Sequence, residues 1–265
     1  MSTPIAVTIA GSDSSAGAGI EADLKTFGAL GVYCGAVITA LTAQNTGGVF
    51  AIYDVPADFI AAQVNAVFTD LDVRAVKIGM LGTAAAIHVI AAALDRYRPK
   101  NVVLDPVLVA SSGERLLREG AIGALRDLIS RVHVLTPNLS EAAVLLGTGV
   151  ARDENEMREQ GHKLLTLGPA TVLIKGGHGE GPESVDYLVG PDLCTRLASP
   201  RINIHGTHGT GCTFSSAIAA GLAKGLPLVQ AAQGAKTYVS AAIAAADRLH
   251  IGSGRAPLHH FHAWW

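Results

Sequence analysis

The chain has 265 residues, of which 49% are hydrophobic and 16% are charged, and its formal net charge at pH 7 is −2. This length allows one large domain or two small ones, and the apolar composition excludes a disordered or coiled-coil protein. Lysine and arginine form no run, so the electrostatic attraction that dominates nucleic-acid binding has no visible source and a nucleic-acid partner is disfavoured.

Neither a membrane span nor a secretory leader is predicted. The longest uncharged stretch runs from Thr26 to Tyr53, but glycines interrupt it and a polar segment follows. The three cysteines, Cys34, Cys194 and Cys212, are odd in number and far apart, which disfavours a disulfide framework and a C-x-x-C metal site. We therefore expect a cytoplasmic protein without a membrane partner.

Short apolar runs alternate with longer helical patterns along almost the whole chain, which predicts βα units around a mostly parallel sheet. A single domain over residues 1–265 is the simplest interpretation, with ligands bound beyond the carboxyl ends of the strands. Strands are predicted at Ile5–Ala10, Gly35–Leu41, Ala75–Ile78, Val102–Asp105, Val132–Thr136, Thr171–Lys175, Ser184–Val189 and Cys194–Ala198. Helices are predicted at Ile20–Leu30, Asp58–Phe68, Ala84–Tyr97, Arg115–Ile129, Glu154–Leu167, Gly211–Ala223 and Leu228–Leu249.

A glycine pattern after the first strand, Gly17-x-Gly19-x-x-Ala22, formally fits a dinucleotide-binding fingerprint. The predicted strand ends too early for that motif, and no acidic residue lies between Asp23 and Asp54 to bind a ribose. A P-loop pattern is absent from the sequence. We therefore disfavour a nicotinamide-dependent dehydrogenase and a P-loop enzyme.

A second glycine cluster, residues 206–213, leads into the helix predicted from Gly211. Amide groups from Gly209 through Thr210 and Gly211 to Cys212 can converge on an anion at the positive end of that helix. The first turn of a helix also lowers the pKa of a thiol, so Cys212 is a candidate base or nucleophile. The alternative is that the glycines only permit close packing and that the thiol is inert.

Polar residues follow two apolar strands, at Asp105 and at Asn138-x-x-Glu141. Carboxylates beside phosphates are typical Mg²⁺ ligands, although Asn138 and Glu141 also fit a helix-capping box. Lys175 ends a third strand and can contact phosphate or stay solvated. An anion hole, a lysine and two carboxylates together favour phosphoryl transfer. The glycine-rich segment Gly176–Pro182 is predicted to be a lid, or else a plain hairpin turn.

Seven stretches of the sequence occur in a telling order: Ala10–Thr26, Thr39–Thr46, Lys77–Leu81, Leu104–Val107, Thr136–Glu141, Ile174–His178 and Thr207–Thr213. Together they resemble the hydroxymethylpyrimidine/phosphomethylpyrimidine kinases of thiamine biosynthesis, within the ribokinase-like superfamily. The resemblance implies a three-layer α/β/α sandwich with a mostly parallel central sheet, ATP and Mg²⁺, and a homodimer. It also implies two successive phosphorylations of 4-amino-5-hydroxymethyl-2-methylpyrimidine.

The resemblance also implies roles for individual residues. Gln44 is expected to contact the pyrimidine edge, and Cys212 takes the place of the aspartate that is the general base in related sugar kinases. Asp105 and Glu141 are expected to organise Mg²⁺. The pocket lining is expected from Gly11, Asp23, Met80 and Val107, the nucleotide contacts from Asn138, Lys175, Thr207, Gly209 and Gly211, and the transfer machinery from Lys175, Gly209, Thr210, Gly211 and Cys212.

Two alternatives remain open. Related kinases with a Gly-Thr-Gly-Cys motif phosphorylate pyridoxal or pyridoxine, which carry a phenolic oxygen where the pyrimidine carries an amine. A non-catalytic pyrimidine-binding regulator is disfavoured, because a binder needs no metal site. The C-terminal histidines at 250, 259, 260 and 262 lack acidic or cysteine partners, so we expect a packing or solvated role for them.

Overall fold

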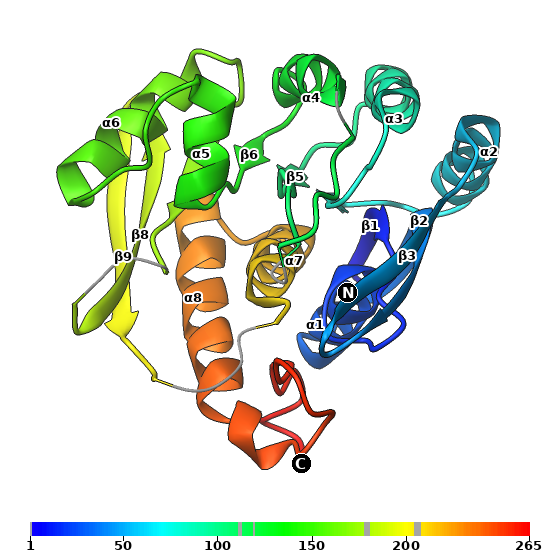
Figure 1. Cartoon of the computed structure of the whole chain (residues 1–265). Coiled ribbons are helices and arrows are strands. Elements are labelled where there is room, and N and C mark those ends of the chain that lie inside the picture. The colour runs from blue at the N-terminus through cyan, green and yellow to red at the C-terminus, as the bar shows by residue number, and fades with distance from the viewer. Residues whose placement is uncertain (1, 111–112, 119, 178–180, 204–207) are drawn as a thin grey trace.

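The computed structural model describes residues 2–110, 113–118, 120–177, 181–203 and 208–265, and its centre is a nine-stranded sheet (Figure 1). The strand order is β3-β2-β1-β4-β5-β6-β7-β8-β9. Neighbours from β2 to β7 pair in parallel, whereas β3, β8 and β9 join antiparallel at the two ends. The strands are β1 Ile5–Gly11, β2 Tyr33–Asn45, β3 Gly48–Asp54, β4 Ala75–Ile78, β5 Val102–Leu104, β6 Val134–Leu135, β7 Thr171–Lys175, β8 Glu183–Gly190 and β9 Leu193–Pro200.

Helices cover both faces of this sheet, which makes three layers (Figure 1). Consecutive strand residues point to opposite faces, so Val102 and Leu104 enter one core while Val103 enters the other. One face carries α2 Ala57–Phe68, α3 Ala84–Tyr97, α4 Ala121–Ile129, α5 Leu139–Leu146 and α6 Glu154–Leu165; the other carries α1 Gly19–Ala29, α7 Thr210–Ala223 and α8 Leu228–Ala244. The predicted three-layer α/β/α sandwich is therefore confirmed.

Several predicted boundaries are wrong for identifiable reasons. The strand β3 was not predicted, because its apolar residues are largely exposed and give no alternation of buried and exposed positions. The helix expected from Arg115 begins only at Ala121, since Val109 and Arg115 form a β-bridge and Gly120 is left-handed at the helix N-cap. The helix expected to reach Leu249 ends at Ala244, and a 3₁₀ turn follows.

The carboxyl ends of β1, β4, β5, β6 and β7 lie along one edge of the sheet, called here the carboxyl edge. In the described part of the chain, no helix has the length and apolar character that a membrane crossing needs. The C-terminal residues His259 and His260 are 1% and 3% exposed, and the His260 carbonyl accepts a hydrogen bond from Tyr238. Packing, one of the two roles expected for the C-terminal histidines, is therefore confirmed for His259 and His260.

Candidate active site

The N-terminus of α7 lies at the carboxyl edge, and two glycines allow its close approach. Gly209 has a φ of +85°, and a Cβ on it would overlap the carbonyl oxygen of Gly17. A Cβ on Gly211 would lie 3.1 Å from Lys175 Nζ and 3.4 Å from Asp105 Oδ2. The first turn of α7 therefore lies against a lysine that ends β7 and an aspartate that follows β5.

Lys175 and Asp105 form an ion pair at this position, with 2.7 Å between Nζ and Oδ1. Lys175 is the last residue of β7 and Asp105 directly follows β5, so the register of the parallel strands brings them together. The other oxygen of Asp105 lies 3.4 Å from the hydroxyl of Ser215 on α7. Burial opposes the charge on Lys175, but Asp105 and Glu141 raise its pKa, so the lysine remains a cation.

Asn138 and Glu141 form the capping box of α5, which was the structural alternative considered for this pair. Glu141 N–H donates to Asn138 Oδ1 at 2.9 Å, and Asn138 N–H donates to Glu141 Oε2 at 2.8 Å. Burial and the nearby Asp105 raise the pKa of Glu141, and Lys175 acts in the opposite direction. Glu141 therefore caps the helix and also belongs to the charged group around Lys175.

Cys212 lies in the first turn of α7 and is partly buried. Burial raises the pKa of its thiol to about 11, although Lys77 acts to lower it. The expectation of a lowered thiol pKa is therefore wrong, because desolvation of the thiolate outweighs the effect of Lys77, and Asp23 and Asp105 also raise the pKa. The residue itself lies where the sequence placed it, beside the Gly211 amide.

The structure places Asp23, expected in the substrate pocket, in the interior. Its side chain and that of Lys77 are fully buried, and Lys77 Nζ lies 2.8 Å from Asp23 Oδ2. Asp23 also accepts hydrogen bonds from the hydroxyls of Thr8 and Ser216. These contacts join α1, β1, β4 and α7. Lys77 was not among the predicted site residues, although a lysine inside an apolar strand is itself a signal of a buried ion pair.

The other predicted substrate residues lie at the carboxyl edge. Gly11 ends β1, and a Cβ on it would lie 3.0 Å from Met80 Sδ, so the two residues are in contact. Val107 follows Asp105, to whose carbonyl its N–H donates at 2.8 Å. Gln44 lies near the end of β2, where its carboxamide contacts His208. The predicted nucleotide residue Thr207 lies outside the described residues.

The segment predicted as a lid, Gly176–Pro182, includes residues 178–180, which also lie outside the described residues. Its two described ends are held by Arg201, whose guanidinium donates to the carbonyls of Gly177 at 2.6 Å and Gly181 at 2.8 Å. Gly176 N–H donates to Asp186 Oδ1 at 2.9 Å. The lid remains a prediction.

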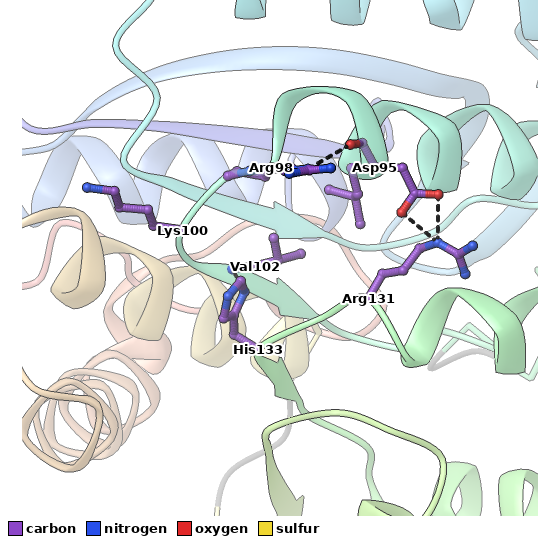
Figure 2. A pocket seen from close by; sticks show the side chains of 8 residues that line it. Asp95, Arg98, Lys100, Val102, Arg131 and His133 are labelled. Carbon is purple, nitrogen blue, oxygen red and sulfur yellow. Dashed lines mark hydrogen bonds and ion pairs between the residues drawn. The ribbon is translucent and has the colours of Figure 1, made fainter.

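A separate hollow lies at the opposite edge of the sheet, near the amino ends of β5 and β6 (Figure 2). Figure 2 shows Arg131 paired with Asp95, and Arg98 beside the end of α3. None of the predicted site residues lines this hollow. Its basic residues stand at helix C-termini, where positive charge complements the helix dipole.

A family model and a curated relative both match this chain over most of its length. The family model described as phosphomethylpyrimidine kinase matches residues 13–259. The chain is 55% identical over 264 residues to the hydroxymethylpyrimidine/phosphomethylpyrimidine kinase of Rhizobium meliloti (strain 1021), and the match covers 99% of each sequence.

Two solved structures are similar to the whole fold. The ADP complex of Bacillus subtilis pyridoxal kinase has a TM-score of 0.90 at 35% identity and covers 99% of both chains. Phosphomethylpyrimidine kinase from Clostridium difficile 630 has a TM-score of 0.80 at 44% identity, covering 90% of this chain and 99% of the other. The matched residues span most of the sequence, and the chain belongs to the phosphomethylpyrimidine kinase family.

Proposed function

We propose that this protein transfers the γ-phosphoryl group of ATP to the hydroxymethyl oxygen of 4-amino-5-hydroxymethyl-2-methylpyrimidine, and then phosphorylates the resulting monophosphate. The observation that carries the proposal is the approach of Gly211, at the N-terminus of α7, to the Lys175–Asp105 ion pair. Phosphoryl transfer needs positioned amides and cations that neutralise the transferring charge, and this arrangement offers both.

Different residues of the chain bind the phosphates and orient the substrate in the proposed reaction. The amides from Gly209 to Cys212 and the ammonium group of Lys175 bind the phosphates, because a helix N-terminus and a lysine both attract anions and Gly211 lies close to Lys175 Nζ. Asn138 and Thr207 complete the proposed nucleotide contacts. Cys212 holds its proton at neutral pH, since burial raises its pKa. Its role in the proposal is therefore to orient the hydroxymethyl oxygen for in-line attack, while Thr210 keeps the first turn of α7 at the phosphates.

Asp105 and Glu141 fit the magnesium ion that the family resemblance implies. Both are carboxylates with hard oxygen donors, and both interact electrostatically with Lys175. No group of three or more His, Cys, Asp or Glu with metal-binding geometry occurs among the described residues, so phosphate oxygens and water complete the proposed donor set. Bound Mg²⁺ would supply neutralisation of phosphate charge.

Phosphorylation of pyridoxal is the second candidate function. The specific support for it is the TM-score of 0.90 with Bacillus subtilis pyridoxal kinase, whose structure is an ADP complex. The pyrimidine is favoured because the relative with that name is 55% identical to this chain, whereas the pyridoxal kinase is 35% identical. A non-catalytic pyrimidine binder has no structural support of its own, because the Lys175–Asp105 pair has no use in such a protein.

The test compares kinetics with the pyrimidine, its monophosphate and pyridoxal, at saturating ATP and Mg²⁺. We expect turnover of the two pyrimidines and a lower kcat/KM for pyridoxal. A preference for pyridoxal of more than about tenfold, or 1.4 kcal/mol in transition-state stabilisation, would overturn the assignment.

A further inference from the structure

The proposed reaction gives no role to a second buried pair of lysine and aspartate, Lys236 and Asp186. Lys236 lies on α8 and Asp186 on β8, and Lys236 Nζ is 2.6 Å from Asp186 Oδ2. Their side chains are only 10% and 3% exposed, and Lys236 also donates to the hydroxyl of Ser184 at 3.1 Å. Because an apolar pair of similar volume often stabilises a fold equally well, stability alone does not account for these buried charges.

The second oxygen of Asp186 accepts a hydrogen bond from the chain directly after Lys175. Pairing of β7 with β8 ends where Lys175 lies opposite Asp186. The next N–H group, that of Gly176, donates to Asp186 Oδ1 at 2.9 Å. A Cβ on Gly176 would overlap the carbonyl oxygen of Val185 and the methyl group of Met157, so the backbone is tightly packed here. The ion pair therefore helps to fix the residue that follows the proposed phosphate-binding lysine.

The backbone of Lys175 is also held from the side of β6. Its N–H group donates to the carbonyl of Pro137 at 2.8 Å, and its backbone forms a β-bridge with Asn138. The hydrogen bond between Gly176 and Asp186 is the corresponding contact on the side of β8. A displacement of about 1 Å at a group that meets the reacting phosphate can lower the rate about 100-fold. The contact at Gly176 therefore matters for where the lysine side chain starts.

We propose that Asp186 and Lys236 are positioning residues, which hold the chain at Gly176 so that the ammonium group of Lys175 lies at the phosphates of ATP. This inference rests on the proposed function, in which Lys175 binds phosphate. Asp186 supplies the acceptor for the Gly176 N–H group, and Lys236 compensates the buried charge of Asp186. Neither side chain contacts the substrate in this proposal, because both act through the backbone of Gly176.

The experiment compares two double variants, Lys236→Met/Asp186→Asn and Lys236→Met/Asp186→Leu. Both remove the two charges with side chains of similar size, but only asparagine keeps an oxygen that can accept from the Gly176 N–H group. The measurements are kcat and KM with varied ATP, the calorimetric Kd of a non-hydrolysable ATP analogue with Mg²⁺, the Kd of the pyrimidine, and unfolding in urea. Arg131→Met/Asp95→Asn removes an ion pair at the opposite edge of the sheet and is the matched control.

We expect the asparagine variant to unfold at a urea concentration close to that of the wild type, because no unpaired charge stays buried. It should keep kcat/KM for ATP within about threefold of the wild type. The leucine variant should stay folded with a lower urea midpoint, because the Gly176 N–H group loses its acceptor. It should lose at least about tenfold in kcat/KM for ATP, through both kcat and KM, and should bind the ATP analogue more weakly. The Kd of the pyrimidine should stay unchanged in both variants, as should the kinetic and binding constants of the control.

A leucine variant with wild-type kinetics and analogue affinity would overturn the proposal, and so would equal kinetic losses in both double variants, because the retained acceptor would then have no effect. If the leucine variant does not fold, Lys236→Met/Asp186→Ala carries the same prediction. If neither folds while the asparagine variant does, Asp186 serves the fold alone and the positioning role is refuted. A wild type that does not phosphorylate the pyrimidine would instead contradict the proposed function. The Kd of the ATP analogue still decides on the positioning role in that case, because it needs no turnover.

Discussion

Cys212 illustrates how two local effects compete at one residue. The N-terminus of α7 and Lys77 favour a thiolate, but burial raises the pKa of the thiol to about 11. A loose phosphoryl-transfer transition state places little charge on the attacking oxygen, so it does not require a strong base. The geometry and the raised pKa together favour an orienting role for this side chain.

The pH dependence of the single-turnover rate tests that role. Because the thiol keeps its proton between pH 7 and 9, we expect the wild-type rate to change by less than about threefold across this range. A resting thiolate as base would instead raise the rate about tenfold for each pH unit below the pKa. Such a slope, lost in Cys212→Ser, would contradict the orienting role.

Lys175 is expected to act on the nucleotide and on the transition state together. Lys175→Met should lower kcat and raise the KM for ATP, with a loss of about 10²–10⁴ in kcat/KM, because a cation facing the transferring phosphate is removed. Steady-state kinetics with varied ATP measures both changes. Lys163→Met, on the exposed surface of α6, controls for the loss of one positive charge. A wild-type kcat in Lys175→Met would refute the assignment.

In helix α5, Glu141 caps the N-terminus and also interacts electrostatically with Lys175 at the carboxyl edge. Glutamine can replace glutamate in a capping box, so Glu141→Gln should keep the fold's stability within about 0.5 kcal/mol while weakening Mg²⁺ binding. Glu141→Ala should weaken Mg²⁺ binding and should also lower the free energy of unfolding by about 1 kcal/mol. Urea unfolding and Mg²⁺-dependent kinetics separate the two effects.

The matched control is Asp153, which caps α6 through the N–H groups of Asn155 and Glu156. Asp153→Ala should cost about 1 kcal/mol in stability and leave the Mg²⁺ dependence unchanged. If Glu141→Gln keeps the wild-type Mg²⁺ dependence, then Glu141 is a cap only.

The buried pair of Lys77 and Asp23 fastens β4 to α1. Lys77→Met leaves a fully buried carboxylate without its cation and should destabilise the fold by about 3–5 kcal/mol in denaturant unfolding. The double variant Lys77→Met/Asp23→Leu should recover most of that loss, because no charge then remains buried. A double variant as unstable as the single one would contradict this explanation.

The parallel centre of the fold was predictable because its strands are short, mostly apolar runs, and because polar residues follow or end several of them. Asp105 and Lys175 were recognisable for that reason, and parallel pairing brought them together. The strand β3 was not predicted. Its apolar residues Phe50, Ile52 and Tyr53 are exposed, so they give no alternation of buried and exposed positions. The burial of Asp23 and the raised pKa of Cys212 depend on partners from distant strands, which no local pattern reveals.

For the whole molecule, the family resemblance implies a homodimer, and β3 offers a surface for it. Phe50 on this edge strand is 71% exposed, and Ile52 and Tyr53 are also exposed. Exposed apolar groups on one strand typically mark an interface. We predict that light scattering after gel filtration gives twice the mass of one chain, and that Phe50→Lys/Ile52→Lys shifts the protein toward monomer.

Val150→Lys is the control, because it replaces an exposed apolar residue outside β3. It should leave the mass measured by light scattering unchanged. A monomeric wild type, or a dimer that the double variant does not weaken, would refute the proposed interface.

In the proposed reaction, the N-terminus of α7, Lys175 and Asp105 position ATP while a hydroxymethyl aminopyrimidine and then its monophosphate receive phosphoryl groups. The most direct test is a ³¹P NMR time course with excess ATP and Mg²⁺ and a known amount of the pyrimidine. We expect two ADP to form for each pyrimidine consumed, with a monophosphate resonance that rises and is then replaced by the resonances of a diphosphate. ADP formation with pyridoxal but none with the pyrimidine would contradict this expectation.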